Sequence, residues 1–393
     1  MAPGTEDSIG TIASPSLPLE LVEEEILCRL PVKILLQLRC ICKSWKSLIS
    51  DDPKFAKKHL QMSKILKQQQ HLIVNALYHG RSSLDYPLSD VFSNISNPTF
   101  TPTQLNIPIS ISFSTNILGI CSCDGIVCLS FDGRRSAVLC NPSLRKYSTL
   151  PPLENHRKRE YCYQREVQSS LFSFGYDHVS EFYKVIAISC FKDKHNEVDV
   201  YTLGTNNWRS IQDFPYSSPF WHGVFVGGTV NWLADEEVSN SCRCQVIVSL
   251  DLEKESYQKI SPPDLEKDGH WALLMFRDCL CISASSNFVD QNMGCYSTFL
   301  DFWIMNEYGI KESWTKLYHF ADLGKVYPYL KTVYISDDDQ VLFNFDDLII
   351  GEWKWVVYNS KNGNVKIPKI KHGSYWTDPE VYVESLISLP CSY

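Results

Sequence analysis

Two kinds of β-hairpin pattern alternate along most of the sequence at a nearly constant spacing. The first kind, for example ILGICSCDGIVCLSF or GVFVGGTVNWLA, turns near residues 125, 178, 228, 278 and 338, in steps of 53, 50, 50 and 60 residues. The second kind follows each of them, and its first four copies end in an aromatic residue: Tyr147, Trp208, Tyr257 and Trp314. Two hairpins in every fifty-odd residues form a four-stranded unit, which is the size of a kelch-like propeller blade.

Five such units are visible between residues 117 and 370, and the ends of the chain can supply a sixth. The strand-like VYVESLISL near the carboxyl end can pair with strands between residues 71 and 93. Such pairing would close the ring and remove its open edges. We therefore predict a mainly β fold: a kelch-like β-propeller with six blades, preceded by a small α-helical domain.

The helical domain is predicted over residues 17–60, where apolar residues recur at helical spacing in three short segments. Pro31 ends the first segment, and Asp51, Asp52 and Pro53 end the third. About forty residues do not usually bury this much apolar surface alone. Either the rest of the chain or another protein must therefore cover it.

The order of residues in this domain resembles a plant-type F-box, which docks on a Skp-type adaptor in a cullin-based ubiquitin ligase. The matching positions include Leu17-Pro18, Leu30-Pro31-Val32-Lys33, Cys42-Lys43, Asp52-Pro53 and His59-Leu60. The resemblance implies that Leu17 and Pro18 start the adaptor contact and that Leu21, Ile26, Leu30, Pro31 and Val32 continue it. Leu35, Ile41, Cys42, Trp45 and Leu48 would complete the interface or the small core behind it, and the sequence leaves this division open.

The propeller half resembles the F-box-associated domain of plant F-box/kelch proteins, to which the S-locus F-box proteins are related. The segments that carry this resemblance include GICSCDGIVCL, LCNPSLRKYSTLPP, FGYDHVSEFYKV, VYTLGTNNWR, NWLA and ESLISL. The chain departs from typical kelch repeats in that the doubled glycine occurs once, at Gly227-Gly228. We therefore divide the chain into a flexible leader (1–16), an F-box (17–60), a linker or helical tail (61–70) and a propeller (71–393).

These resemblances imply a substrate-recognition subunit of a Skp-cullin-F-box ubiquitin ligase that is not itself an enzyme. The F-box would bind the adaptor, and through it a cullin, while the propeller binds a protein target. Loops on a rigid scaffold usually carry recognition, so the expected target contacts are the irregular connections 154–168, 190–197, 234–244, 264–270 and 287–297. Two alternatives remain: a propeller that binds a partner without the ligase, and an enzymatic or carbohydrate-binding propeller.

Linear motifs for catalysis are absent from the sequence. It contains no HExxH, no phosphate-cradling glycine loop and no GxSxG. The cysteine groups Cys40/Cys42, Cys121/Cys123/Cys128, Cys242/Cys244 and Cys279/Cys281 lack the spacing of structural zinc sites and are expected to pack in the core. We therefore expect no catalytic residue, no cofactor and no metal.

Charge and hydropathy narrow the range of partners. The net charge of −8 argues against nucleic acid and anionic membranes as partners. The sequence contains no run of about 18 apolar residues, so we predict no transmembrane helix. The first sixteen residues lack a secretory pattern, so we expect the protein in the cytoplasm, the nucleus or both. Residues 17–70 hold ten basic and six acidic side chains, net +4, whereas residues 71–393 carry −10. The two parts are therefore expected to face different partners.

Overall fold

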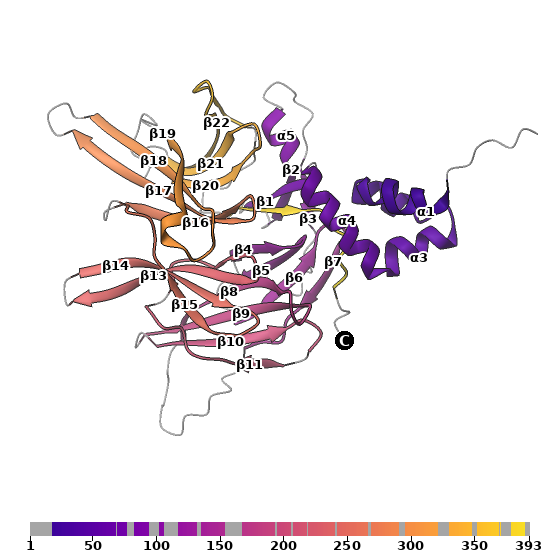
Figure 1. Cartoon of the computed structure of the whole chain (residues 1–393), viewed down its shortest axis with the longest axis horizontal. Coiled ribbons are helices and arrows are strands. Elements are labelled where there is room, and N and C mark those ends of the chain that lie inside the picture. Colours follow the sequence, from indigo (N-terminus) through magenta and orange to yellow (C-terminus); the bar gives the residue numbers. More distant parts are fainter. Residues whose placement is uncertain are drawn as a thin grey trace, which may run out of the picture.

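The structure, a computed structural model, describes residues 18–67, 69–76, 82–93, 102–105, 117–131, 135–153, 167–192, 195–205, 207–217, 219–239, 242–265, 269–290, 295–320, 330–347, 352–368, 370 and 379–389. Six four-stranded antiparallel sheets form the blades of a ring, and the amino-terminal helices lie to one side of it (Figure 1). This is the mainly β, six-bladed propeller with a preceding helical domain that the hairpin spacing predicts.

The amino-terminal region consists of short helices with defined starting residues. Its elements are α1 (Leu19–Leu21), η1 (Val22–Ile26), η2 (Leu27–Arg29), α2 (Val32–Leu38), α3 (Lys43–Asp51) and α4 (Pro53–Leu66). The Cys42 sulfur accepts the Trp45 N–H at the start of α3, and the Asp52 carboxylate accepts two N–H groups at the start of α4. α4 runs through residues 61–66 without a break and ends at Lys67, whose φ of 51° is left-handed.

Five consecutive blades follow one pattern, in which each strand pairs with the next along the chain. The first blade is β4 (Ile117–Cys123), β5 (Ile126–Phe131), β6 (Ala137–Asn141) and β7 (Lys146–Thr149). The second is β8 (Val167–Asp177), β9 (Phe182–Phe191), β10 (Asn196–Thr202) and β11 (Trp208–Ser210), and the third is β12 (Val224–Val226), β13 (Thr229–Ser239), β14 (Cys242–Asp251) and β15 (Tyr257–Ile260).

The fourth and fifth blades repeat this order. The fourth is β16 (His270–Phe276), β17 (Cys279–Asp290), β18 (Cys295–Met305) and β19 (Trp314–Phe320), with the 3-10 turn η3 (Lys311–Ser313) before β19. The fifth is β20 (Leu330–Ile335), β21 (Gln340–Asp347), β22 (Glu352–Asn359) and β23 (Val365–Lys366). All five predicted blades are therefore present.

The sixth blade joins the two ends of the chain. Its strand order is β24 (Glu380–Val383), β1 (Gln70–Ala76), β2 (Ser82–Pro87) and β3 (Thr103–Leu105), and the short helix α5 (Leu88–Ser93) follows β2. β24 pairs antiparallel with β1, with Gln70 opposite Val383 and Ile73 opposite Glu380. β24 also contacts β4 and β20, the first strands of the two neighbouring blades. The predicted closure by the carboxyl-terminal strand is therefore confirmed.

Strand direction gives the propeller two different ends. Because antiparallel strands alternate in direction, the turns between first and second strands all lie at one end of the ring. Three of these turns, Asp124-Gly125, Gly227-Gly228 and Arg277-Asp278, have positive φ at both residues, as tight two-residue hairpins require. The amino-terminal helices lie at this end, which we call the near end. The β13–β14 and β17–β18 hairpins project from the opposite side, the far end (Figure 1).

Two tryptophans that end repeats tie neighbouring blades together. The Trp208 indole Nε1 donates to the Pro151 carbonyl at 2.8 Å, and the Trp314 Nε1 donates to the Ser261 carbonyl at 3.0 Å. Each bond joins the outer strand of one blade to residues that leave the preceding blade. Tyr147 holds the corresponding position in the first blade but is 45% exposed, so this anchor does not recur in every repeat.

Most of the described cysteines are buried, two are exposed, and Cys244 and Cys279 are partly buried. Cys121, Cys123 and Cys128 lie buried in the apolar cluster of the first two blades. Burial also raises the pKa of Cys140 to about 12, which keeps this thiol neutral at physiological pH. Cys40 and Cys42 are exposed, so the expectation of core packing is wrong for this pair. Cys42 is held at the surface because its sulfur caps α3.

Candidate functional site

The amino-terminal helices, which resemble an F-box and are called the F-box below, form a small core that the propeller completes. Seven buried F-box residues form one cluster with Leu386, which lies beyond β24; they are Leu27, Cys28, Val32, Leu35, Ile49, Phe55 and Ala56. Leu144, in the near-end turn between β6 and β7, and Ile387 pack against the same cluster. The rest of the chain therefore covers part of the apolar surface that this domain cannot bury alone.

Another part of that apolar surface remains exposed. Leu21, Ile26, Ile34 and Ile41 are 46%, 41%, 39% and 64% exposed. They are four of the fifteen exposed large hydrophobic residues in the described part of the chain, and they fall within 21 consecutive positions. Exposed apolar residues that lie together on a monomeric protein often mark a surface that binds a partner. We call these four residues the F-box apolar set.

The residues predicted to contact an adaptor fall into three groups. Those exposed are Pro18, Leu21, Ile26, Pro31, Ile41 and Cys42. Leu30, Trp45 and Leu48 are partly buried against the F-box core, whereas Val32 and Leu35 lie inside it at 1% and 0% exposure. Val32 and Leu35 therefore hold the helices together and present no accessible surface. Leu17 lies outside the described residues.

Ile34 is an exposed residue of α2 that the sequence analysis did not select. Val32 and Leu35 are three positions apart and share the buried face of this helix. Ile34 lies between them in sequence and points to another face, where it is 39% exposed. Helical phase was the signal that could have identified it, once Val32 and Leu35 were assigned to the core.

His59 on α4 holds the turn that precedes α2. Its side chain is fully buried, and its Nε2 lies 2.9 Å from the Leu30 carbonyl oxygen. Burial lowers the pKa of His59 and outweighs the opposing effect of this hydrogen bond. The imidazole is therefore neutral at physiological pH and donates its Nε2–H to Leu30, which fixes the exposed Pro31 beside it.

α4 also binds the near end of the propeller through three lysines. Lys57 pairs with Glu181 at 3.3 Å, Lys64 with Asp124 at 2.6 Å, and Lys67, the residue that ends the helix, with Asp337 at 2.5 Å. The three carboxylates belong to near-end turns of the second, first and fifth blades. Exposed ion pairs are each worth about 0–1 kcal/mol, but three of them along one helix restrict its orientation. The positively charged F-box thus faces the negatively charged propeller. Part of the charge difference between the two halves therefore forms contacts within the chain.

A buried polar cluster links the sixth blade to α2. His71 Nδ1 lies 3.0 Å from Asp85 Oδ1, and its Nε2 lies 3.5 Å from Glu384 Oε1. The Tyr382 hydroxyl donates to Asp85 at 3.1 Å. The Glu384 carboxylate accepts the backbone N–H of Val32, the first residue of α2. A carboxylate at this place satisfies a free N–H of the helix and complements the helix dipole.

Protonation of this cluster follows from its burial and its charges. Burial opposes a charge on His71, but the hydrogen bond with Asp85 and the charges of Asp85 and Glu384 outweigh burial, so the pKa of His71 is raised. Burial raises the pKa of Glu384, although His71 acts against this shift. Both groups therefore hold a proton to higher pH than they would in the unfolded chain.

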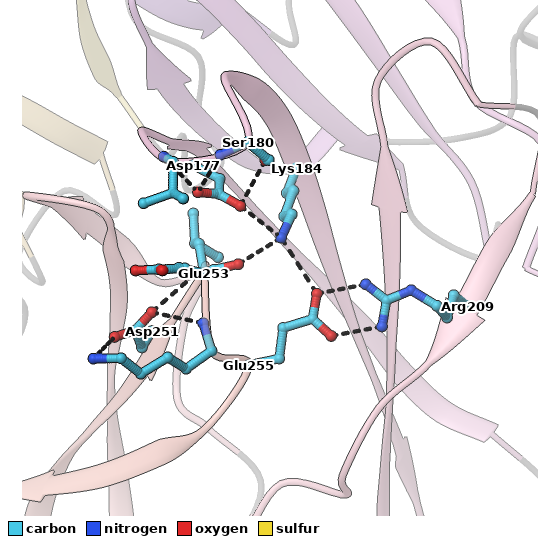
Figure 2. Close-up of polar contacts among 10 residues, drawn as sticks. Asp177, Ser180, Lys184, Arg209, Asp251, Glu253 and Glu255 are labelled. Carbon is cyan, nitrogen blue, oxygen red and sulfur yellow. Dashed lines mark hydrogen bonds and ion pairs between the residues drawn. The ribbon is translucent and has the colours of Figure 1, made fainter.

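A second polar cluster joins the second and third blades at the near end (Figure 2). Lys184, whose side chain is 8% exposed, contacts Asp177 at 2.9 Å, the Leu252 carbonyl at 2.5 Å and Glu255 at 3.3 Å. Arg209 adds two parallel hydrogen bonds to the Glu255 carboxylate. Burial favours the neutral acid at Asp177, but hydrogen bonds from Ser180, Lys184 and two backbone N–H groups outweigh it and lower its pKa to about 2.

This second cluster has a structural explanation. Each carboxylate in it is matched by a cation or by N–H donors, and no serine or cysteine nucleophile is placed against a free base. Its partners come from the β8–β9 turn, β9, β11 and the β14–β15 turn, so it fixes one blade against the next. In the described residues, no three His, Cys, Asp or Glu side chains are grouped in a way that could hold a metal ion.

The connections predicted to contact a target all belong to the far end. They join second to third strands or fourth strands to the next blade, and the strands that bound them point away from the near-end turns. Residues 154–166, 193–194, 240–241, 266–268 and 291–294 of these connections lie outside the described part of the chain. The longest hairpin pair, β17 with β18, carries one of them.

A pair of exposed aromatic residues lies at the far end, between β11 and β12, where no target contact was predicted. Phe220 and Trp221 are 39% and 46% exposed. The Phe220 N–H donates to the Leu233 carbonyl at 3.1 Å, and the Gly223 N–H donates to Ser173 Oγ at 2.8 Å. A Cβ atom at Gly223 would lie 2.4 Å from a Val230 methyl carbon. Backbone bonds and a glycine without spare room thus hold this aromatic pair in place.

The described helices include none that is long and apolar enough to cross a membrane.

Comparisons with known proteins agree with both halves of this architecture. The F-box domain family matches residues 15–57, and the F-box associated beta propeller domain family matches residues 77–389. The F-box/kelch-repeat protein At3g23880 of Arabidopsis thaliana is 28% identical over 390 residues, which cover 95% of this chain and 96% of that protein. The F-box protein CPR1 of the same plant is 26% identical over 405 residues, covering 95% and 89%.

The fold and the matched domains define an F-box protein with a β-propeller as its second domain. More particularly, the chain belongs to the plant F-box family whose propeller is the F-box-associated domain. Among solved structures, a chain from a study of two prolyl endopeptidases overlays with a TM-score of 0.40 at 8% identity, covering 86% of this chain and 57% of that one. This overlay is too weak to bear on function.

Proposed function

We propose that this protein is the substrate-recognition subunit of a Skp-cullin-F-box ubiquitin ligase. The observation that carries the proposal is the F-box apolar set, which stays exposed although the propeller covers another side of the same domain. A Skp-type adaptor, which links an F-box to a cullin, is the partner that the family offers for this surface. The chain then contributes binding and placement, and ubiquitin transfer belongs to other subunits.

Within this proposal, the exposed residues Pro18, Leu21, Ile26, Ile34 and Ile41 contact the adaptor. Val32 and Leu35 do not contact the adaptor but hold α2 in place by packing in the F-box core. Leu17 belongs to the same contact by its resemblance to the F-box pattern. We also propose the division into a leader (1–16), an F-box (17–60) and a propeller (71–393), with residues 61–66 as a rigid helical connection between the last two.

The placement of the two halves supports this function. The amino-terminal helices that carry the F-box apolar set lie at the near end, and the long β13–β14 and β17–β18 hairpins lie at the far end (Figure 1). α4 runs unbroken from the F-box to the propeller and is held there by three ion pairs. A rigid connection raises the effective concentration of a bound target near the ligase, whereas a flexible tether dilutes it. The function places the protein in the cytoplasm or nucleus.

The adaptor contact is tested by measuring the affinity of the purified full chain for a recombinant Skp-type adaptor. We expect Leu21→Asp combined with Ile41→Asp to weaken binding by about a hundredfold or more, because two exposed apolar anchors become charged. Ile367→Asp is the matched control, since Ile367 is 68% exposed in the fifth blade, far from the F-box in sequence. Failure of the wild type to bind, or equal binding by the double variant, would overturn the proposal.

The target contact is tested by affinity purification from plant cells in which the proteasome is inhibited. Proteins that bind the wild-type chain should also be recovered with the F-box double variant, because its far end is unchanged. Their ubiquitination, in contrast, should be lost with that variant. Recovery of bound proteins whose ubiquitination does not depend on the F-box would favour a propeller that acts without the ligase.

A further inference from the structure

The last described residues, 384–389, connect the F-box to three different parts of the propeller. They leave β24 at the near end and continue without regular secondary structure. The Glu384 N–H donates to the Gln69 carbonyl at 2.8 Å, next to β1. Asn141 at the end of β6 donates to the carbonyls of Ser385 and Ile387 at 3.1 and 2.8 Å. We call residues 384–389 the carboxyl-terminal clamp.

Residues of the clamp pack into two different cores. Leu386 is 5% exposed and belongs to the F-box core, together with Val32, Leu35 and Phe55. Leu389 is also 5% exposed and belongs to the core between the first and second blades. Between them, Ile387 contacts both cores. One short segment therefore depends on the F-box and on the closed ring at the same time.

The clamp also reaches α2 through its first residue. Glu384 accepts the Val32 N–H at the start of α2 and lies 3.5 Å from His71 of β1. A residue of the propeller thus caps the helix that carries Ile34, one member of the F-box apolar set. Displacement of the clamp would remove this cap and leave a gap in the F-box core where Leu386 had been.

From these contacts we propose that the F-box of this chain reaches its adaptor-binding form only when the clamp is docked. Docking of the clamp requires β24 to have closed the sixth blade, because the clamp continues directly from that strand. Closure of the propeller and order in the F-box helices are therefore one coupled equilibrium. Coupling of this kind is reciprocal, so a change on either side shifts the other.

The order of the helices is one test of this coupling, and it does not depend on any partner. Hydrogen exchange is measured on the full chain with Leu386→Ala and with Leu300→Ala, a control at a fully buried residue of the fourth blade. Leu386→Ala should speed exchange in α2 and α3 by about tenfold or more while β13 and β17 stay protected. Leu300→Ala should speed exchange in β17 and β18 and leave α2 unchanged.

A reverse variant covers the case in which Leu386→Ala does not fold. Leu35→Ala, at a fully buried F-box residue, should speed exchange in residues 384–389 and in β1, since coupling acts in both directions. The inference is overturned if the first variant leaves the F-box protected, if both first variants speed exchange in the F-box equally, or if Leu35→Ala leaves the clamp protected.

Adaptor binding provides the second readout and rests on the proposed function. In Leu386→Ala, only a fraction of the molecules should have an ordered F-box, so the apparent affinity for a Skp-type adaptor should fall about tenfold. In Leu300→Ala, this affinity should not fall. If the wild type does not bind the adaptor, the proposed function fails, and the exchange experiment still decides the coupling. If Leu386→Ala loses F-box protection but binds with wild-type affinity, the claim about adaptor binding is wrong.

Discussion

The near and far ends of the propeller are built from the same six sheets and differ in how their connections are held. At the near end, tight turns present Asp124, Glu181 and Asp337 to the lysines of α4, and the Lys184 cluster fixes two blades against each other. At the far end, the strands of the third and fourth blades extend outward, as in β17, which has twelve residues against seven in β16. One end holds a domain within the chain, and the other carries the long hairpins of two blades.

This difference shows how a closed ring can separate stability from recognition. At the near end, ion pairs join α4 to three blades, and the buried Lys184 cluster joins two blades, so a change there should affect the fold. Trp221, in contrast, is 46% exposed, and we expect the fold to depend less on its side chain. The four predictions below test this separation in order of their expected effect on stability.

The largest loss is expected when Lys184 is replaced by Met. The substitution leaves Asp177 and Glu255 with one cation fewer in a site where the lysine side chain is 8% exposed. Removing one partner of a buried ion pair typically costs about 3–5 kcal/mol. Chemical denaturation should show this loss in the free energy of unfolding. Lys254→Met is the control, because Lys254 pairs with Asp251 at the surface, is 71% exposed and should cost less than about 1 kcal/mol.

A smaller loss is expected for Gly125→Ala in the first near-end turn. Gly125 has a φ of 78°, and a Cβ atom there would lie 2.5 Å from the Val383 carbonyl oxygen and from Ser385 Oγ. Gly309→Ala separates the two causes, since Gly309 has a φ of 81° and nothing within 4 Å of a Cβ atom. The control should cost about 1–2 kcal/mol for its backbone alone, and Gly125→Ala about 1–3 kcal/mol more. If Gly125→Ala and Gly309→Ala lowered the free energy of unfolding equally, the residues of the closing strand would not restrict the space at the Gly125 turn.

A pH dependence is expected at the near end and should be smaller than these losses. His71 faces Asp85, Glu384, Asp90 and Tyr382, and its pKa is raised in the folded chain. The folded state therefore binds its proton more tightly than the unfolded state, so this contribution to stability is complete below about pH 6.5 and is lost as pH rises through the raised pKa. The raised pKa of Glu384 acts in the same direction.

The dependence of stability on pH can be measured by hydrogen exchange of α2, the helix whose first residue interacts with Glu384. Protection of α2, corrected for the intrinsic effect of pH on exchange, should fall in the wild type as the pH rises above about 6.5. His71→Gln should remove most of this change. A pH effect of the same size in His71→Gln would assign it to other groups.

The smallest effect on stability is expected at the far end. Phe220→Ala combined with Trp221→Ala should change the free energy of unfolding by less than about 1 kcal/mol, because both side chains are partly exposed. The same variant should lose proteins that the wild-type chain recovers from cells, since exposed aromatic residues often dominate interface energies. A large loss of stability would show that the aromatic pair belongs to the fold and would contradict the separation of the two ends.

The sequence predicted the blades because their signals are local. Turn residues such as Gly125 and Gly228 set each hairpin, and the repeat spacing then gives the number of blades. The closing strand was also predictable, since an open ring would leave two unpaired edges. The F-box residues were recognisable from their order alone, without knowledge of how they pack.

The contacts between the two halves could not be predicted in the same way. Leu386 and Phe55 share a core although more than three hundred residues separate them, and Lys67 pairs with Asp337 over a similar interval. Neither residue of such a pair has a local pattern that identifies its partner. For the same reason the sequence could not show that Val32 and Leu35 are buried while Ile34 is exposed, because burial on α2 depends on what packs against this helix.

The position of Leu386 has a consequence for protein synthesis. The F-box helices leave the ribosome well before Leu386, the residue that completes their core, because more than three hundred residues separate them. At about 5–20 residues per second, the intervening chain takes on the order of tens of seconds to be made. During that time the core of the nascent F-box is incomplete. The adaptor would therefore meet a complete F-box core only on chains whose synthesis has passed Leu386.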